Sequence, residues 1–328
     1  MNEETAILYF GAETEDAGKR LDAFLAEKIE GWSRSRLQKL IDAGECLVNE
    51  KRAKSSYKLR GGEAIEIELA ETLLETIEPE NIPLKIVYED ESLAVINKKA
   101  GMVVHPGAGV SSGTLANAIA WHFKFQISDS KFENESIRNP KSEIRNRIGI
   151  VHRLDKDTSG LIVVAKDETT HEALSAQFRE REVYKSYVAL VHGVVKDESG
   201  KISEKIGRDR WHRTRMDVSK NGRDALSIWK IRQRFEKFTL LDVQIKTGRT
   251  HQIRVHLSFI NHPIVGDEIY NSGRDKTVSD MKIRQAIADL NRFFLHAEKL
   301  AFTHPQTKER LSFVAPLPKE LTDFLELL

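Results

Sequence analysis

The chain has 328 residues, a formal net charge of +1 at pH 7 and a single cysteine, Cys46. This length is sufficient for two domains. Because the charge is nearly balanced, any surface for nucleic acid must come from local separation of charge and not from a basic composition. One cysteine excludes disulfide frameworks and thiolate zinc sites within the chain, which favours a reducing compartment.

Neither a membrane span nor a secretion signal is predicted. No apolar run approaches the ~20 residues that cross a bilayer, and the acidic start, Met1 to Thr5, lacks the basic-then-apolar order of a signal peptide. We therefore expect a cytoplasmic protein without a membrane partner.

The first 70 residues have the pattern of a small mixed domain. Apolar residues between positions 21 and 29 repeat with the helical period, and a second helix begins near Ser33 and ends at Gly44. Residues 65–69 alternate between apolar and acidic side chains, which predicts a half-buried strand. Basic residues gather between 19 and 60, whereas every charged residue from 63 to 80 is a glutamate.

Three runs of this region, 33–44, 47–52 and 58–63, closely resemble the small RNA-binding domain named after ribosomal protein S-four. The resemblance implies that Arg34, Arg36 and Lys39, at the start of the second helix, present a phosphate-binding face. An ordinary solvated surface is the alternative for such charges. We expect this domain at residues 15–75, followed by an acidic linker at 76–82.

The stretch from Gly149 to Gly160 concentrates ionisable side chains between two strand-like runs. Its last four residues, Asp157 to Gly160, are typical of a tight turn before the apolar strand 161–165. A turn alone does not account for His152, Arg153 and Asp155 before it. Loops held by rigid strands are where catalytic groups tend to lie, so Asp155 is the leading catalytic candidate and His152 is interpreted as a structural hydrogen-bonding residue.

A tyrosine-containing strand and a basic helix follow. Period two places Tyr184 and Tyr187 on opposite faces of the strand 183–191, so that at most one lines a site with it. A helix starting near Thr250 carries His251 and Arg254 on one side. Zinc would need carboxylate or thiolate ligands at suitable spacing, and an anion-binding function for Arg249, His251 and Arg254 fits better.

A second basic segment covers residues 206–215, in which Arg208 and Arg213 flank Trp211. Basic side chains interleaved with an aromatic ring suit a nucleic-acid backbone, and a charged surface hairpin is an equal alternative. The polar stretch 126–147 is predicted to be a flexible loop.

Three functions are candidates for this combination of residues. The run His152-Arg153-Leu154-Asp155 is not that of a protein kinase, because the last two residues are reversed and no Asp-Phe-Gly follows. A protein that only binds RNA would explain the first domain but not the large second one. An enzyme with Asp155 as nucleophile requires a positive charge beside the carboxylate, and Arg254 is the arginine best suited by type.

The second region resembles the RluA/RluD family of pseudouridine synthases. The stretch 152–160 is similar to the family signature, 247–256 to a later motif, 98–107 to the first motif and 185–189 to the tyrosine motif. The resemblance covers roughly residues 83–320. The RNA-binding domain in front, together with the run from His262 to Asp267, makes the chain most similar to the RluD branch, which modifies large-subunit ribosomal RNA. The 126–147 loop and an insert at 273–291 depart from the expected pattern.

The resemblance implies an α+β protein whose catalytic domain, at 83–325, has a central mixed, mainly antiparallel sheet flanked by helices and loops. It implies isomerisation of uridine to pseudouridine in large-subunit (23S) ribosomal RNA, with the base flipped out of the strand. Asp155 would act on the glycosidic bond, Arg254 would keep it charged, Tyr187 would stack on the base, and Arg153 would fill the vacated space.

We accordingly expect catalytic roles for Asp155, Tyr187 and Arg254, and RNA contacts for another set: Arg153, Arg34, Arg36, Lys39, Arg249, His251, Arg208 and Arg213. No metal or cofactor is expected, and the protein is expected to be a monomer. The alternatives are a non-catalytic ribosome-associated RNA-binding protein and a pseudouridine synthase acting on transfer RNA.

Overall fold

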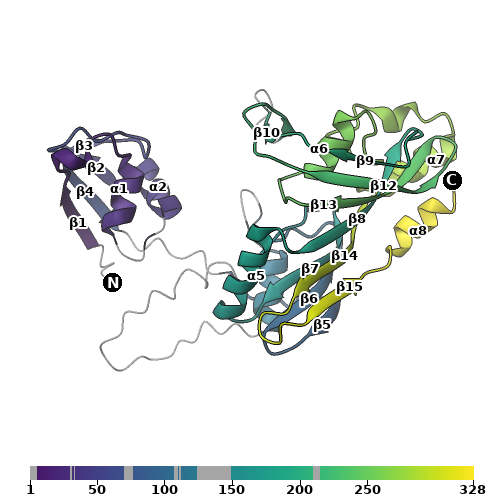
Figure 1. Ribbon diagram of the computed structural model, residues 1–328, viewed down its shortest axis with the longest axis horizontal. Helices are drawn as coiled ribbons and strands as arrows, with labels where there is room; N and C mark the ends of the chain where they lie inside the picture. The colour runs from purple at the N-terminus through teal and green to yellow at the C-terminus, as the bar shows by residue number, and fades with distance from the viewer. Residues whose placement is uncertain are drawn as a thin grey trace. The chain divides into compact units, whose positions relative to one another are not determined.

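The structure is a computed structural model of the chain, and it divides into two compact units. The residues that it describes are 6–29, 32, 34–69, 77–106, 110, 112–123, 149–209 and 215–328. Figure 1 shows the helices and strands of each unit. None of the helices within these ranges has the length and apolar character needed to cross a membrane.

The first unit packs two helices on a small antiparallel sheet with strand order β1-β4-β2-β3. Its elements are β1 (Ala6–Gly11), the 3-10 helix η1 (Thr14–Asp16), α1 (Leu21–Lys28), α2 (Arg34–Ala43), β2 (Cys46–Val48), β3 (Lys51–Arg52) and β4 (Ala64–Leu69). Both predicted helices are confirmed, and Gly44 follows α2 with a φ of +95° that favours glycine. Phe24, Leu37 and Ile67 lie in the buried core between helices and sheet.

The second unit is built on one large sheet, to which nine strands of the described chain belong. The strands are β5 (Ile86–Glu89), β6 (Leu93–Lys98), β7 (Ser159–Ala165), β14 (Leu295–Thr303), β8 (Tyr184–His192), β13 (Phe238–Ile245), β12 (Ser227–Arg234) and β9 (Ser199–Ile202) in spatial order, with β15 (Arg310–Val314) paired to β14. Within these pairs only β7 and β14 run parallel. The predicted mixed, mainly antiparallel sheet is therefore confirmed.

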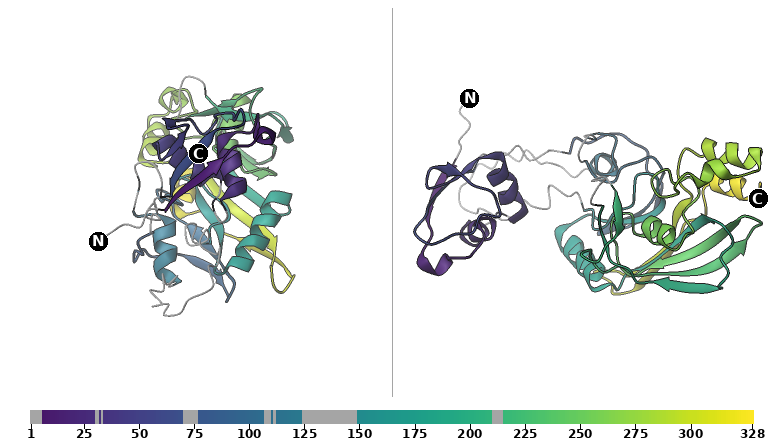
Figure 2. Two further views of the ribbon diagram at one scale, coloured as in Figure 1. Left: turned by 90° about the vertical axis from the view of Figure 1, so that its left-hand side faces the viewer. Right: turned by 90° about the horizontal axis from the view of Figure 1, so that it is seen from above.

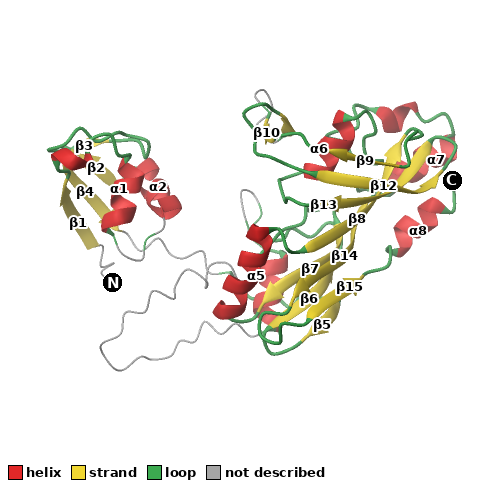
Figure 3. Cartoon of the chain, in the orientation of Figure 1, coloured by secondary structure: helices red, strands yellow, loops and turns green. Residues whose placement is uncertain are grey.

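Helices cover both faces of this sheet. They are α3 (Leu115–His122), α5 (Glu168–Glu180), α6 (Gln252–Phe259), α7 (Met281–Asp289) and α8 (Lys319–Leu325), with a 3-10 helix η2 (Arg274–Thr277). A separate ribbon pairs β10 (Ile206–Arg208) with β11 (Met216–Val218). Figure 3 shows α6 and α7 toward the end of the sheet that holds β9 and β12, and α5 near β6 and β7.

Strand β7 is buried along its whole length because it is covered on both faces. Successive side chains of a strand point to opposite faces. Ile162 and Val164 pack in the cluster that includes Leu115 of α3, whereas Leu161 and Val163 pack in the cluster that includes Leu174 of α5. Figure 2 shows α3 and α5 on opposite sides of the sheet. This burial explains the continuous apolar run that follows the polar stretch 149–158.

A glycine at the start of β7 permits its pairing with β14. Gly160 has a φ of +115°, and a Cβ there would lie 2.2 Å from the carbonyl oxygen of Ala297. Gly101 also has a positive φ, +80°, but a Cβ would meet no atom within 4 Å.

We predict that Gly160→Ala lowers the free energy of unfolding by at least about 2 kcal/mol more than Gly101→Ala, because only the first change forces the two strands apart. Urea unfolding followed by circular dichroism measures both values. Equal losses in the two variants would contradict the steric explanation.

Candidate active site

The strand order brings the 149–158 stretch close to Tyr187. Ser159, at the start of β7, pairs with His296 of β14, and His296 pairs on its other side with Val188 of β8. Asp155 lies four residues before Ser159 and Tyr187 lies next to Val188. The charge of Asp155 reaches Tyr187, since burial first and this carboxylate second raise the pKa of the tyrosine above its ordinary value.

The polar stretch is held against β7 by hydrogen bonds. The Ala165 N–H donates to the carbonyl of Gly149 at 2.8 Å, and the Val163 N–H donates to Nε2 of His152 at 3.0 Å. The His152 ring stacks on Phe178 of α5, with centroids 4.5 Å apart. Burial lowers the pKa of His152 to about 3, assisted by the charge of Lys185. The structural role predicted for His152 is thus confirmed.

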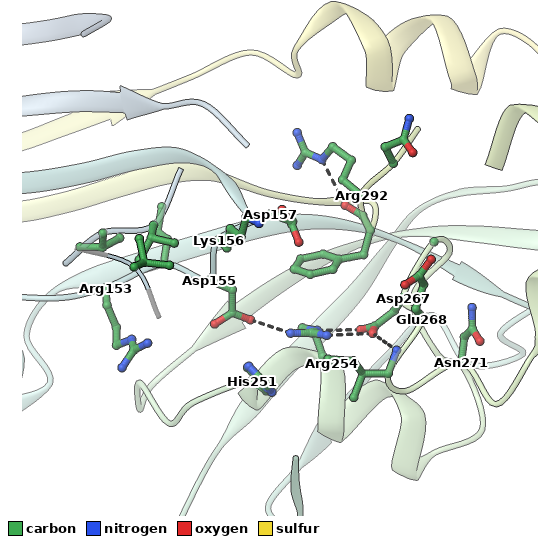
Figure 4. Close-up of a pocket in the computed structure, with 18 of the residues that line it drawn as sticks. Arg153, Asp155, Lys156, Asp157, His251, Arg254, Asp267, Glu268, Asn271 and Arg292 are labelled. Carbon is green, nitrogen blue, oxygen red and sulfur yellow. Dashed lines mark hydrogen bonds and ion pairs between the residues drawn. The ribbon is translucent and has the colours of Figure 1, made fainter. Parts of the chain in front are cut away.

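Arg254, on α6, joins two carboxylates. Its Nε and Nη2 donate to Asp267 at 2.7 and 2.9 Å, and its Nη1 donates to Oδ2 of Asp155 at 3.2 Å. The structure therefore brings together Asp155 and Arg254, the pair expected from the sequence, and adds Asp267. Figure 4 shows the guanidinium between the two acids.

The guanidinium is also packed between rings. Its central carbon lies 4.9 Å from the centroid of Tyr270 and 4.3 Å from that of Phe293. Arg215 lies over the Tyr270 ring as well, at 5.0 Å. These cation–π contacts fix the plane of Arg254 and so the direction of its Nη1 toward Asp155.

Electrostatics keep Arg254 charged although it is buried. Burial opposes the charged form, but the hydrogen bonds and charges of Asp267, together with Asp155, hold the pKa of Arg254 above its ordinary value. The Asp155 side chain is 19% exposed and Arg254 only 5%. Among the described residues, the only hydrogen bond to the Asp155 carboxylate is at Oδ2, so Oδ1 has no donor in that part of the chain.

The start of α6 differs in one detail from the prediction. Thr250 is not the N-cap; His251 takes that position with a φ of +57° and makes no side-chain cap. The backbone is instead held by Gln252, whose Oε1 accepts from the Arg249 N–H at 3.1 Å. His251 Nδ1 lies 2.8 Å from the Tyr270 hydroxyl, which aligns the ring with the cleft beside Arg254.

These groups line a cleft of about 1550 Å³. Arg153, Asp155, His251 and Arg254 all belong to its walls. The cleft is larger than the roughly 300–1,000 Å³ of ordinary small-molecule sites. A carboxylate oriented by a buried arginine in such a cleft can act as a nucleophile or a base on one part of a large ligand.

Comparison with known proteins agrees with this geometry. Residues 92–259 match the sequence profile described as RNA pseudouridylate synthase, and residues 19–65 match that of the S4 domain. The chain belongs to the RNA pseudouridylate synthase family. It is thus an isomerase with an S4 domain in front of the catalytic unit.

The synthase has relatives along almost its whole length. It is 38% identical over 315 residues to a Bacillus subtilis (strain 168) protein named uncharacterized RNA pseudouridine synthase YlyB, covering 96% of each chain. It is 39% identical over 307 residues to a Xanthomonas campestris pv. campestris protein named ribosomal large subunit pseudouridine synthase D, covering 93% of this chain and 87% of the relative.

The fold of the synthase also has solved counterparts. The structure of human RNA pseudouridylate synthase domain containing 1 matches with a TM-score of 0.51 and 25% identity, covering 73% of this chain and 85% of the other. Human RNA pseudouridylate synthase domain containing 4 matches with a TM-score of 0.54 at 24% identity, covering 74% and 91%. The second likeness concerns the fold alone.

One residue expected to be catalytic, Tyr187, and two expected RNA contacts, Arg249 and Arg208, are not among the described residues that line the cleft. Tyr187 is 6% exposed and packs in the core. Arg249 is half-buried, with its Nε donating to the carbonyl of Asp224 at 3.2 Å, and Arg208 is exposed on β10. Arg213 lies outside the described residues.

In the S4 domain, Arg34 has a structural partner. Its Nη2 donates to the fully buried Asp22 at 3.1 Å, beside the bidentate pair that Arg20 makes with the same carboxylate. The hydrogen bond from Arg20, followed by those from Gln38 and Arg34, outweighs burial and lowers the pKa of Asp22. Arg36 and Lys39 belong to α2, and their side chains lie outside the described part of the structure.

Some residues of the synthase hold the predicted site residues in place and were not predicted from the sequence. Asp267, Tyr270 and Phe293 hold Arg254, and only Asp267 carried a signal, as the last residue of the motif that begins at His262. Lys98 begins the motif 98–107, and no role in the site was predicted for it. Its ammonium donates to the carbonyls of Lys99, Met102 and Lys156 at 2.9, 2.9 and 3.0 Å, and so ties the residue after Asp155 to the end of β6.

Lys98 is 1% exposed, and burial, together with the charge of Arg292, lowers its pKa from 10.5 to about 7 against the opposing charges of Asp157 and Asp155. Between these two pH values the unfolded chain binds more protons than the folded chain, so this group makes stability rise with pH.

We predict that the free energy of unfolding of the wild type, minus that of Lys98→Met, increases between pH 7 and pH 9 by about 1 kcal/mol per pH unit. Urea unfolding at a series of pH values measures this difference. Two curves that stay parallel over this range would contradict the lowered pKa.

Proposed function

We propose that this synthase converts specific uridines of large-subunit (23S) ribosomal RNA into pseudouridine, with Asp155 as the catalytic carboxylate. The observation that carries the proposal is the hydrogen bond between Arg254 and Oδ2 of Asp155, a carboxylate that lines the cleft. Ribosomal RNA is proposed as the substrate because relatives such as the Xanthomonas protein are named ribosomal large subunit pseudouridine synthase D.

The chemistry is an isomerisation and balances without a co-substrate. Uridine leaves the stack at a cost of a few kcal/mol. The C1′–N1 bond breaks with assistance from Asp155, either by attack on the sugar or base or by formation of a glycal. The uracil rotates in the closed site, C5 bonds to C1′, and the proton that C5 loses is replaced by one gained at N1.

Each neighbouring residue has a proposed task in these steps. Arg254 stabilises the carboxylate of Asp155 by a charge-assisted hydrogen bond. Arg153, which is exposed on the cleft wall, fills the space left by the flipped nucleotide, and His251 contacts the RNA beside it. Tyr187 stacks on the base near C5, and this task requires movement at the cleft because the tyrosine is buried.

The remaining parts of the proposal concern the whole chain. The S4 domain at 15–75 and the basic residues Arg208, Arg213 and Arg249 of the catalytic domain would hold the RNA backbone. The linker at 76–82 would join the S4 domain to the catalytic domain at 83–325. No cofactor or metal is assigned a step. The protein is proposed to act as a cytoplasmic monomer.

We predict that Asp155→Asn reduces pseudouridine formation at least ~10³-fold without loss of RNA binding, because the amide is neither a nucleophile nor a base. Each turnover breaks one C5–H bond, so release of tritium from ribosomal RNA labelled at C5 of uridine measures the reaction. Asp157→Asn, the same change two residues away, is the control and should retain most activity.

Two results would overturn the proposal in different parts. Full activity of Asp155→Asn would refute the catalytic role of this carboxylate. Wild-type protein that releases no tritium from ribosomal RNA would favour the alternatives, and release from transfer RNA instead would identify a synthase for that substrate.

A second prediction concerns the S4 domain. Arg36→Glu combined with Lys39→Glu should weaken RNA binding about tenfold or more and flatten its salt dependence, because fewer counterions are released. Lys28→Glu, a change of the same kind at an exposed position of α1, should have a smaller effect. Filter binding over a salt series measures affinity and slope, and unchanged affinity of the double variant would remove the phosphate-clamp role.

A further inference from the structure

The insert at 273–291, which lies outside the residues matched by the family profile, forms part of the catalytic cleft. It consists of η2 and α7, and it contributes Lys276, Arg284, Ile287 and Asn291 to the lining of the same cleft that contains Asp155. The insert is therefore a wall of the substrate site and not a remote surface loop.

The wall is firmly attached to the sheet. Asp275 Oδ1 lies 2.7 Å from Nε2 of His192 on β8 and accepts from the Gly266 N–H at 3.2 Å. Lys237 donates to the hydroxyl of Ser279 at 2.7 Å. Val278 and Ile287 are 7% and 4% exposed and belong to the main core. The backbone that carries the side chains of this wall is consequently fixed in place before any ligand arrives.

Two cations on the wall are available to a ligand. Lys276, on η2, and Arg284, on α7, are exposed. No hydrogen bond or ion pair links either side chain to another residue in the part of the chain that the structure describes. Asp275, the acid of the insert that also lines the cleft, is already engaged by His192 and Asn271. Charges without protein partners that face a substrate cleft can bind an anionic ligand at little cost in desolvation.

The wall and Arg153 flank the catalytic pair. Figure 4 shows Arg153 on one side of the Asp155–Arg254 pair and Asn271, which contacts Asp275 of the insert, on the other. A nucleotide flipped into the cleft has one phosphate on its 5′ side and one on its 3′ side, and the chain continues in both directions. The cleft volume of about 1550 Å³ leaves room for nucleotides next to the flipped one.

We propose that Lys276 and Arg284 bind phosphates of the RNA strand that flanks the target uridine on the side away from Arg153, and so help to select the substrate. This inference rests on the proposed function and adds a specificity surface to it. Glu268, exposed on the same cleft, repels a phosphate placed next to it, so that the wall accepts the strand in one register and disfavours others.

The test compares two double variants of the full-length protein that are matched in charge and location. Lys276→Gln with Arg284→Gln removes the two cations of the cleft. Arg274→Gln with Lys282→Gln removes one arginine and one lysine from the same two elements, η2 and α7, at positions that do not line the cleft. The substrate is unmodified large-subunit ribosomal RNA made by transcription and labelled with tritium at C5 of uridine.

The measured quantity is the protein concentration that gives half of the maximal single-turnover rate of tritium release. The cleft variant should raise it about tenfold or more at 0.1 M salt, and should reduce the slope of its salt dependence by about 0.7 for each lost phosphate contact. The control variant should change it less than about twofold. Circular dichroism of both variants verifies that they fold.

Two outcomes overturn the inference. The first is that the cleft variant has the same half-maximal protein concentration and salt slope as the wild type. The second is that the half-maximal concentration of the control variant rises as much as that of the cleft variant, which would indicate a general effect of charge. Failure of the proposed function is distinguishable, because wild-type protein would then release no tritium from this RNA at any concentration.

Discussion

The candidate active site depends on one buried cation, Arg254, which two carboxylates share. A buried guanidinium is costly unless its donors are satisfied, and Asp267, which is fully buried, satisfies two donors of Arg254 with bidentate geometry. That geometry leaves Nη1 for Asp155. Asp267 therefore supplies most of the compensation for burial, while Asp155 remains at the edge of the cleft, where a substrate can reach it. Tyr270 and Phe293 hold the guanidinium plane between their rings.

The sheet positions this pair by ordinary packing. Strand β7 is covered by α3 on one face and α5 on the other, so the loop that precedes it has a rigid base. The backbone hydrogen bond to His152 and the Lys98 ammonium secure that loop at two points, before and after Asp155.

Local separation of charge reconciles a net charge of +1 with a polyanionic substrate. Some basic side chains form ion pairs with acidic residues of the protein itself, as Arg34 does with Asp22. Others, such as Arg153 and Arg284, are exposed on the cleft. Only the latter kind can meet RNA directly, and residue type alone does not separate the two.

Periodicity and local motifs determined much of this protein from sequence: the two helices of the S4 domain, the buried strand after Gly160, the structural role of His152 and the candidacy of Asp155. These features depend on neighbours within a few residues. The partnership of Asp155 with Arg254 was inferred by residue type, and its geometry was decided only by the tertiary structure, because 99 residues separate the two. Only the tertiary structure also decided the roles of Tyr270, Phe293 and the wall at 273–291, because no local sequence pattern indicates them. Their contacts arise from strand pairing and helix packing between distant segments.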